Sequence, residues 1–404
     1  MKMPGWIAIG VVALAMLTAA NAGEWWEVFS ADPPEARMGH SLTALDDGKV
    51  YLFGGLTQTL EMRNDLHVYW DDEWGRLDDL TVRPPPRRNH AAWGMNGRLY
   101  VMGGVAAGGS FLSDLWEFDP APPPAVEPWR HVGDTTGMTA RAHHAAVPLP
   151  NGDVMFFGGQ SAEGVQKDVW IAHRGTGEWR QVVSMPHNWS GGFSHLIGTT
   201  DVVAAGTGGG RVYGYSIADD EWTWDDNGPP LNGYASSFVV PAEEGREKIV
   251  AFGGYDTNYN HNTETYEFRP RWRAYGGSST PRVEQMPRPT TMPAVAVLPR
   301  TTTSVEAVVF GGMDQDHTAR NETWLYSVPA APRPARLEVA QDSETPAFGF
   351  YGEPGYVYDV ERTRSLTTPD WEWQATYTGT AENVQHYIPG TTVEVYRVRG
   401  NRPD

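Results

Sequence analysis

The sequence predicts an all-β protein in which small repeated sheets are arranged as a ring. Two observations support this prediction. A short apolar run that ends in Gly-Gly, or in a degenerate form of it, recurs along the chain, and no long segment has helical periodicity. The runs are VYLFGG, LYVMGG, VMFFGG, VVAAGTGGG, IVAFGG and AVVFGG, with their first paired glycines at positions 54, 103, 158, 206, 253 and 311. A spacing near ~50 residues is typical of repeat units that pack against one another.

Each apolar run predicts a strand that is buried on both faces, because about five β-branched or aromatic residues follow one another without a polar one. The glycines that follow allow backbone dihedral angles that a Cβ atom forbids, and they let a neighbouring sheet approach closely. One such unit cannot cover both of its own faces. It therefore needs a neighbour on each side, which a ring of units supplies.

Composition narrows the choice of partners. The chain has 404 residues and a formal net charge of −19, which argues against nucleic acids and anionic membranes because both require a basic face. It contains no cysteine, so stability must come from burial and ring closure rather than from disulfides.

Residues 1–22 predict a secretory signal peptide. Lys2 supplies a positive start, Trp6 to Ala20 is almost wholly apolar, and Ala20-Asn21-Ala22 supplies a small-residue cleavage site. The alternative is a membrane anchor, but this apolar stretch is shorter than the ~20 residues that a span requires. We therefore expect an exported protein, secreted, periplasmic or associated with the cell surface, without an integral membrane segment after cleavage.

Three kinds of residue keep a fixed order around the Gly-Gly pairs. An Arg-x-x-His motif comes before the pair, an acid opens the strand after it, and a tryptophan marks the strand after that. The full Arg-x-x-His motifs are Arg37 with His40, Arg87 with His90, and Arg141 with His144. The array resembles the kelch family of β-propellers over roughly residues 24–330. The resemblance implies a six-bladed kelch β-propeller with four strands in each blade.

The two ends of the repeat array complement each other. The sixth repeat ends at residues 321–328 without its tryptophan strand, whereas Glu24 to Phe29 forms an unassigned strand before the first motif. We expect this N-terminal strand to complete the last blade and to remove a free sheet edge. The later repeats depart from the pattern, because no arginine precedes His195, and Tyr234 and Pro293 lie near the expected histidine positions.

The predicted division of the chain is a signal peptide at 1–22, the propeller at 23–330, a Pro-rich linker at 331–336 and a small β domain at 337–404. Residues 355–361 and 393–398 of the last part alternate as strands do. This part resembles small β modules appended to secreted bacterial proteins, and we expect a β-sandwich-like domain.

Two enzymatic functions are suggested by relatives of this fold. The copper radical site of galactose-oxidase-type propellers requires a tyrosine cross-linked to a cysteine, and the absence of cysteine excludes it. A sialic-acid mutarotase-like isomerase would need a cation for the substrate carboxylate and proton carriers, roles open to the three arginines and three histidines of the motif. The alternative is that these six residues order the innermost strand, since they belong to the repeat itself. No repeat-aligned acid is evident opposite the arginines, which favours binding over catalysis.

No metal or cofactor site is indicated. His143 and His144 would point to opposite faces of a strand. The acidic turns, such as Asp71-Asp72-Glu73, lack the glycine and the closing glutamate of a calcium loop.

A ligand site is expected on the face from which the loops after Gly-Gly emerge. The loop from Gly254 to Asn262 is rich in residues that hydrogen-bond or stack, including Tyr255, Asn258 and Tyr259. We expect these three residues to lie at the channel mouth with the motif's arginines and histidines. The expected function is a non-catalytic module that binds a carbohydrate or a protein, and three guanidinium groups favour an anionic ligand.

Overall fold

The computed structural model describes most of the chain between residues 24 and 328 and the strands beyond it. Within 24–328 the description omits 78–79, 175, 207–209, 227, 232, 241–246, 257, 259, 263, 269–279, 282–289 and 299–304. Beyond residue 328 it covers the backbone of six strands between residues 338 and 401. The predicted signal peptide (1–22) and linker (331–336) lie outside the described residues.

The protein is all-β, and each Gly-Gly repeat in the described part forms an antiparallel sheet that contains four successive strands. The sheet of the first repeat has a fifth, short strand, β2 (Arg37–Met38), which pairs with β4 (Val50–Thr57). The strands are numbered along the chain, and the sheets are numbered here in the order of their Gly-Gly runs. Sheet 1 contains β3 (Ser41–Ala44), β4 (Val50–Thr57), β5 (Met62–Trp70) and β6 (Glu73–Arg76). Sheet 2 contains β8 (Ala91–Met95), β9 (Arg98–Met102), β11 (Asp114–Phe118) and β12 (Trp129–Asp134). Sheet 3 contains β14 (Ala145–Pro148), β15 (Val154–Phe157), β18 (Val169–Ala172) and β19 (Trp179–Val182).

The second half repeats this arrangement. Sheet 4 contains β20 (Phe193–Ile197), β21 (Asp201–Ala205), β22 (Val212–Ser216) and β23 (Glu221–Asp225). Sheet 5 contains β24 (Ala235–Val240), β25 (Lys248–Gly253), β26 (Thr265–Phe268) and β27 (Thr280–Pro281). Sheet 6 contains β28 (Ala294–Leu298), β29 (Val305–Phe310), β30 (Thr323–Val328) and β1 (Glu24–Val28).

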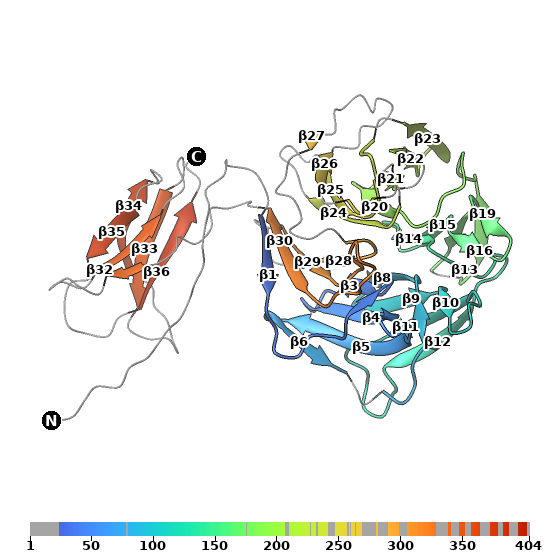
Figure 1. The fold of residues 1–404 in the computed structure, drawn as a ribbon, viewed down its shortest axis with the longest axis horizontal. Helices are drawn as coiled ribbons and strands as arrows, with labels where there is room; N and C mark the ends of the chain where they lie inside the picture. The colour runs from blue at the N-terminus through green and yellow to red at the C-terminus, as the bar shows by residue number, and fades with distance from the viewer. Residues whose placement is uncertain are drawn as a thin grey trace.

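Neighbouring sheets contact each other through their first strands. β3 contacts β8, β8 contacts β14, β14 contacts β20, β20 contacts β24, β24 contacts β28, and β28 contacts β3. Figure 1 shows these first strands on the inner side of the sheets. The order of contacts therefore follows the order of the repeats and returns to its starting point.

The predicted pairing of the N-terminal strand with the last repeat is confirmed. β1 pairs antiparallel with β30, in a register that places Glu24 opposite Ser327 and Val28 opposite Thr323. Trp25 of β1 packs edge-on against Phe252 at a ring-centroid distance of 5.0 Å and against Tyr326 at 4.8 Å. The first strand of the chain thus supplies the fourth strand of sheet 6.

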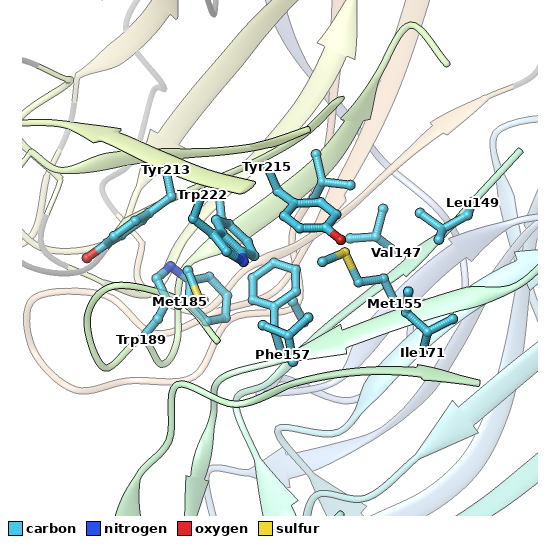
Figure 2. Packing of buried hydrophobic residues seen from close by; sticks show 14 residues of the cluster. Val147, Leu149, Met155, Phe157, Ile171, Met185, Trp189, Tyr213, Tyr215 and Trp222 are labelled. Atoms are coloured by element: carbon cyan, nitrogen blue, oxygen red, sulfur yellow. The ribbon is translucent and has the colours of Figure 1, made fainter. Parts of the chain in front are cut away.

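The apolar runs are buried on both faces, as predicted. In β4, Val50 and Leu52 belong to a cluster shared with sheet 6, whereas Tyr51 and Phe53 belong to a cluster shared with sheet 2. The same alternation places Phe157 of β15 against Trp222 of sheet 4, with ring centroids 5.5 Å apart (Figure 2). Each run therefore packs one sheet against both of its neighbours.

The Gly-Gly pairs have the conformation that the sequence indicates. Gly54 and Gly55 have φ angles of 68° and 101°, in the region that side chains rarely adopt. A Cβ atom on Gly54 would lie 2.8 Å from the carbonyl oxygen of Arg87 in sheet 2. The glycines are therefore required both by the backbone conformation and by the approach of the next sheet.

The C-terminal part is also antiparallel β structure. One sheet has the order β31 (Glu338–Ala340), β32 (Ala347–Tyr351) and β35 (Asn383–Tyr387). The other has the order β34 (Glu372–Thr378), β33 (Val357–Thr363) and β36 (Val395–Asn401). Its sandwich architecture and its boundary at residue 337 stay predictions. No helix in the described part of the chain is long and apolar enough to cross a membrane.

We predict that Trp25 is required for the stability of sheet 6. Replacing it with alanine should lower the free energy of unfolding by about 3–5 kcal/mol, because a buried indole is removed from between two sheets. Phe29→Ala is the matched control, since Phe29 is 82% exposed and its loss should change stability by less than about 0.5 kcal/mol. Thermal denaturation followed by circular dichroism measures both. Equal melting temperatures for Trp25→Ala and the wild type would contradict the role assigned to β1.

Candidate functional site

The two kinds of connection expected to carry a site emerge on one face of the protein. Within each sheet the strands are antiparallel, so the loop after Gly-Gly and the residues that lead into the next first strand lie at the same strand ends. Backbone hydrogen bonds join them, from Gly104 N–H to the Arg141 carbonyl at 2.9 Å and from Gly312 N–H to the Arg37 carbonyl at 2.9 Å. We call this side the Gly-Gly face.

The three arginines of the repeat motif are buried in ion pairs rather than open to a ligand. Each guanidinium pairs through two nitrogens with the acid that opens the third strand of its own sheet, and it also donates to the carbonyl of the first Gly-Gly glycine. The pairs are Arg37–Asp65, Arg87–Asp114 and Arg141–Asp168, each with a shortest N–O distance of 2.6 Å. The arginine side chains are at most 1% exposed. From the sequence these acids were recognised only as the start of a strand, and the loop after Gly-Gly returns each of them to the arginine of its own sheet.

These contacts hold the carboxylates in their charged form. Burial alone would raise the pKa of Asp168, but hydrogen bonds from Arg141 and Trp170 outweigh it, and the net pKa lies below the usual range. The pKa of Asp114 is lowered in the same way, because hydrogen bonds from Arg87 and Trp116 outweigh the effect of burial. The acid, the arginine and the tryptophan of a repeat are therefore one internal network.

The motif's histidines lie beside the glycines of the preceding sheet, with His40 and His144 buried and His90 half-buried. His90 packs against Phe53 with ring centroids 5.5 Å apart, and His40 packs against Phe310 at the same distance. Burial, reinforced by the charge of the neighbouring arginine, lowers the pKa of His40 and of His144 to about 3 and lowers that of His90 as well. These rings are neutral packing elements at physiological pH. The structure supplies no ligand-facing role for them, and the packing alternative is the one that their contacts support.

A series of left-handed backbone residues lies between the arginine and the histidine positions, and we call it the collar. It has one member before the first strand of each sheet, and five N–H to carbonyl hydrogen bonds of 2.5–3.0 Å join successive members from the first sheet to the sixth. Its members are Gly39, Asn89, His143, Gly191, Tyr234 and Met292, with φ angles between 55° and 69°. The sequence did not indicate the collar, because Tyr234 and Met292 are residue types that rarely adopt this conformation.

The collar also corrects the alignment of the later repeats. In sheet 4 the residue after the collar residue Gly191 is Gly192, so Gly192 occupies the position of the motif's histidine. His195 does not, because it lies within β20, where its ring nitrogen Nε2 is 2.7 Å from the Ser237 hydroxyl. Tyr234 is a collar residue rather than a histidine equivalent. Pro293 does occupy the histidine position. Two residues before Gly191, Trp189 takes the place of the arginine, and its carbonyl accepts from Gly159 N–H at 2.7 Å.

Aromatic and histidine rings, two of them from collar residues, form a continuous arc. His143 contacts Tyr234 at a ring-centroid distance of 5.3 Å, and Tyr234 contacts Tyr255 at 6.1 Å. His261 then contacts Tyr255 at 5.1 Å and His317 at 6.2 Å. The arc thus joins the residues that lead into sheets 3 and 5 to the loops after the Gly-Gly pairs of sheets 5 and 6.

The expected ligand loop is only partly at this site. Tyr255 lies in the arc, in contact with Tyr234 and His261. Asn258 is exposed, and its backbone N–H donates to the Asp256 carboxylate at 2.8 Å, so it belongs to a turn held by that aspartate. Tyr259 lies outside the described residues.

Arg88 differs from the arginines of the motif. It is half-buried, and no carboxylate pairs with it among the residues that the structure describes. Its Nε atom is buried without a hydrogen-bond partner. Burial and the charge of Arg88 together lower the pKa of His143 to about 4. Sequence reasoning missed Arg88 because it stands beside the repeat motif and has no counterpart in the other repeats.

A separate cavity of ≈300 Å³ lies among the first strands. Its polar side chains are Thr43, Ser194 and His195, and the rest of its lining is mostly small or apolar. Within the described residues, no cluster of three or more His, Asp or Glu side chains could hold a metal ion.

Comparison with known proteins supports kelch repeats in this chain. Residues 14–209 match the KLHDC2/KLHL20/DRC7 kelch-repeats domain. The chain is 26% identical over 231 residues to acyl-CoA-binding domain-containing protein 5 of Arabidopsis thaliana, a match that covers 57% of this chain and 29% of that protein. It is 27% identical over 156 residues to an F-box/kelch-repeat protein of the same plant, covering 36% of this chain and 32% of that protein. The chain spans less than a third of the length of these relatives.

We predict that the buried arginines matter for stability. Arg141→Ala should lower the free energy of unfolding by about 3–5 kcal/mol, because it leaves Asp168 charged and half-enclosed without its partner. Arg88→Ala is the control and should change stability by less than about 0.5 kcal/mol, because no ion pair is lost. Urea denaturation of the two variants measures the difference. A larger loss in Arg88→Ala than in Arg141→Ala would contradict this assignment.

Acidification should destabilise the protein before its carboxylates titrate. The pKa of His144 falls from 6.5 to about 3 on burial, so below pH 6.5 protons bind the unfolded chain more tightly than the folded one. Stability from this residue is complete above pH 6.5 and is lost toward pH 3, at up to about 1.4 kcal/mol per pH unit. Urea denaturation at pH 7, 6 and 5 should give a shallower slope for His144→Gln. His131→Gln, at an exposed histidine, should keep the wild-type slope. Identical slopes for all three proteins would refute the prediction.

Proposed function

We propose that the six sheets are the blades of one closed kelch β-propeller and that its Gly-Gly face binds a protein partner without catalysis. Closure is supported by two contacts that join the ends of the array, the pairing of β1 with β30 and the packing of β28 against β3. The kelch match supports a protein-interaction role. We also propose that the protein is exported, on the basis of its N-terminal sequence.

The exposed apolar side chains are the reason for proposing that the partner binds to the Gly-Gly face. Nine large hydrophobic residues are exposed among those that the structure describes, and five of them lie in connections on this face. The five are Phe29, Leu60, Val82, Val165 and Val183. Exposed apolar side chains around a polar mouth are typical of protein contact surfaces, where an apolar zone and a few polar contacts act together. We therefore propose that the partner covers the Gly-Gly face, and we call the five exposed apolar residues on it the apolar rim.

The two alternative functions, a mutarotase-like reaction and glycan binding, are less well supported by the contacts of the residues concerned. A mutarotase-like reaction was expected to draw on the motif's arginines and histidines, and the arginines are held in internal ion pairs while the histidines are enclosed and neutral. A glycan ligand would be held by polar and aromatic groups such as those of the arc, but the apolar rim offers it little. Binding of a protein uses both features.

We predict that charge introduced on the rim will release the partner. Affinity purification with the tagged protein from extracts of its own organism should recover specific proteins with the wild type. Leu60→Asp combined with Val165→Asp should lose them, because a desolvated carboxylate opposes an apolar contact. Trp70→Asp is the control, since Trp70 is 59% exposed next to the turn on the opposite face. Loss of the same proteins only with Trp70→Asp would place the contact on the other face, and a glycan-array signal insensitive to all variants would favour a carbohydrate ligand.

A further inference from the structure

Resting on the proposed function, we propose that Arg88, His143 and Tyr234 form a subsite on the collar that binds a carboxylate of the protein partner. The three side chains come from the residues that lead into sheets 2, 3 and 5. The charge of Arg88 acts on both His143 and Tyr234, and the rings of these two residues are 5.3 Å apart, so the three side chains are neighbours on the Gly-Gly face.

Arg88 differs from other arginines on this face in its lack of an acidic partner among the described residues. Other arginines on this face have acids, since Arg63 contacts Glu35 and Glu61, and Arg320 contacts Asp314. Arg88 has none in the described part of the chain, and its Nε is buried without a partner. A half-buried guanidinium without an acceptor costs free energy that an incoming acceptor would recover. A carboxylate matches it best, because its two oxygens accept two parallel hydrogen bonds.

The neighbouring side chains fit the same ligand. Burial raises the pKa of Tyr234, so its hydroxyl remains protonated and can donate. His143 is neutral at pH 7 and retains one N–H donor. Their rings are 5.3 Å apart and nearly perpendicular, which offers aromatic surface to the carbon atoms that carry the carboxylate. Arg88 is therefore the cation of a small site whose other members are neutral donors.

The backbone holds this subsite in place before a ligand arrives. His143 N–H donates to the Asn89 carbonyl at 2.9 Å, and Gly191 joins His143 to Tyr234 through bonds of 3.0 and 2.5 Å. Gly191 also makes room for Tyr234, because a Cβ atom at Gly191 would lie 3.0 Å from the tyrosine ring. Because the backbone of the subsite is already ordered, binding costs little conformational entropy, which favours measurable affinity even for a small ligand.

The subsite can be tested with benzoate, which joins a carboxylate to a ring, and with benzamide as its neutral isostere. Protein labelled with ¹⁵N-arginine reports the Nε–H signal of Arg88, assigned by its loss in Arg88→Gln. Benzoate should shift this signal in a saturable way, and benzamide should leave it unchanged. Arg88→Gln should weaken benzoate binding tenfold or more, followed at the Tyr234 ring signals. Equal responses to benzoate and benzamide, or an Arg88 signal unmoved by benzoate, would overturn the proposal.

Two capped peptides then identify the source of the carboxylate. Ac-Phe-Glu-NH₂ carries it on a side chain, and Ac-Phe-Gln-OH carries it at the C-terminus. A shift of the Arg88 signal with either peptide supports a protein source and says which kind. A response to glucuronate and to neither peptide would overturn the protein source. Partner loss in the rim variant together with an unresponsive Arg88 would reject this subsite and leave the proposed function standing.

Discussion

The buried ion pair between a repeat arginine and the acid of the third strand fixes the architecture of the Gly-Gly face. The Arg141 guanidinium joins Asp168 to the carbonyl of Gly158, so one side chain ties the start of sheet 3 to the ends of its second and third strands. Its own carbonyl accepts from Gly104 of sheet 2. One residue thus orders its own sheet through its side chain and the preceding sheet through its backbone. The collar residue His143 stands two positions later and is placed by these contacts.

Later sheets show which part of this arrangement can be replaced. Trp189 occupies the arginine position of sheet 4, and Thr290 occupies that of sheet 6, yet their carbonyls still accept from Gly159 and Gly254 at 2.7 and 2.9 Å. The Trp189 ring packs against Phe157 at 5.2 Å. A packed aromatic ring can substitute for a buried ion pair, because the pair must first overcome the desolvation of both charges. The backbone contact is therefore the shared element, and the side chain that supports it varies.

Sequence patterns predicted the fold in detail wherever a residue type has one physical use. The Gly-Gly pairs, the doubly buried runs such as Val50 to Phe53 and the strand at Glu24 to Val28 are where the sequence places them. The motif's arginines were expected at the channel mouth because the turns that contain them share a face with the loops after Gly-Gly. Their burial depends on acids such as Asp65, which lies 28 positions from Arg37, and only the path of the loop after Gly-Gly brings the two together. The collar was not predictable, because hydrogen bonds between sheets impose its conformation on Tyr234 and Met292 against their preference.

Recognition in a repeat protein falls to residues that break the repeat, since those that recur are occupied with packing. Arg88 and Tyr234 are such residues, and their place on a protein of net charge −19 limits what they can select. The negative charge of the surrounding surface would repel a partner with a run of acids. A single carboxylate is repelled only by charges within the Debye length of about 8 Å. In the proposed subsite, the half-buried guanidinium of Arg88 would act on a carboxylate at contact distance, where its attraction is stronger than that of an exposed charge. The electrostatics therefore favour a single carboxylate in an otherwise neutral or basic segment over an acidic tract.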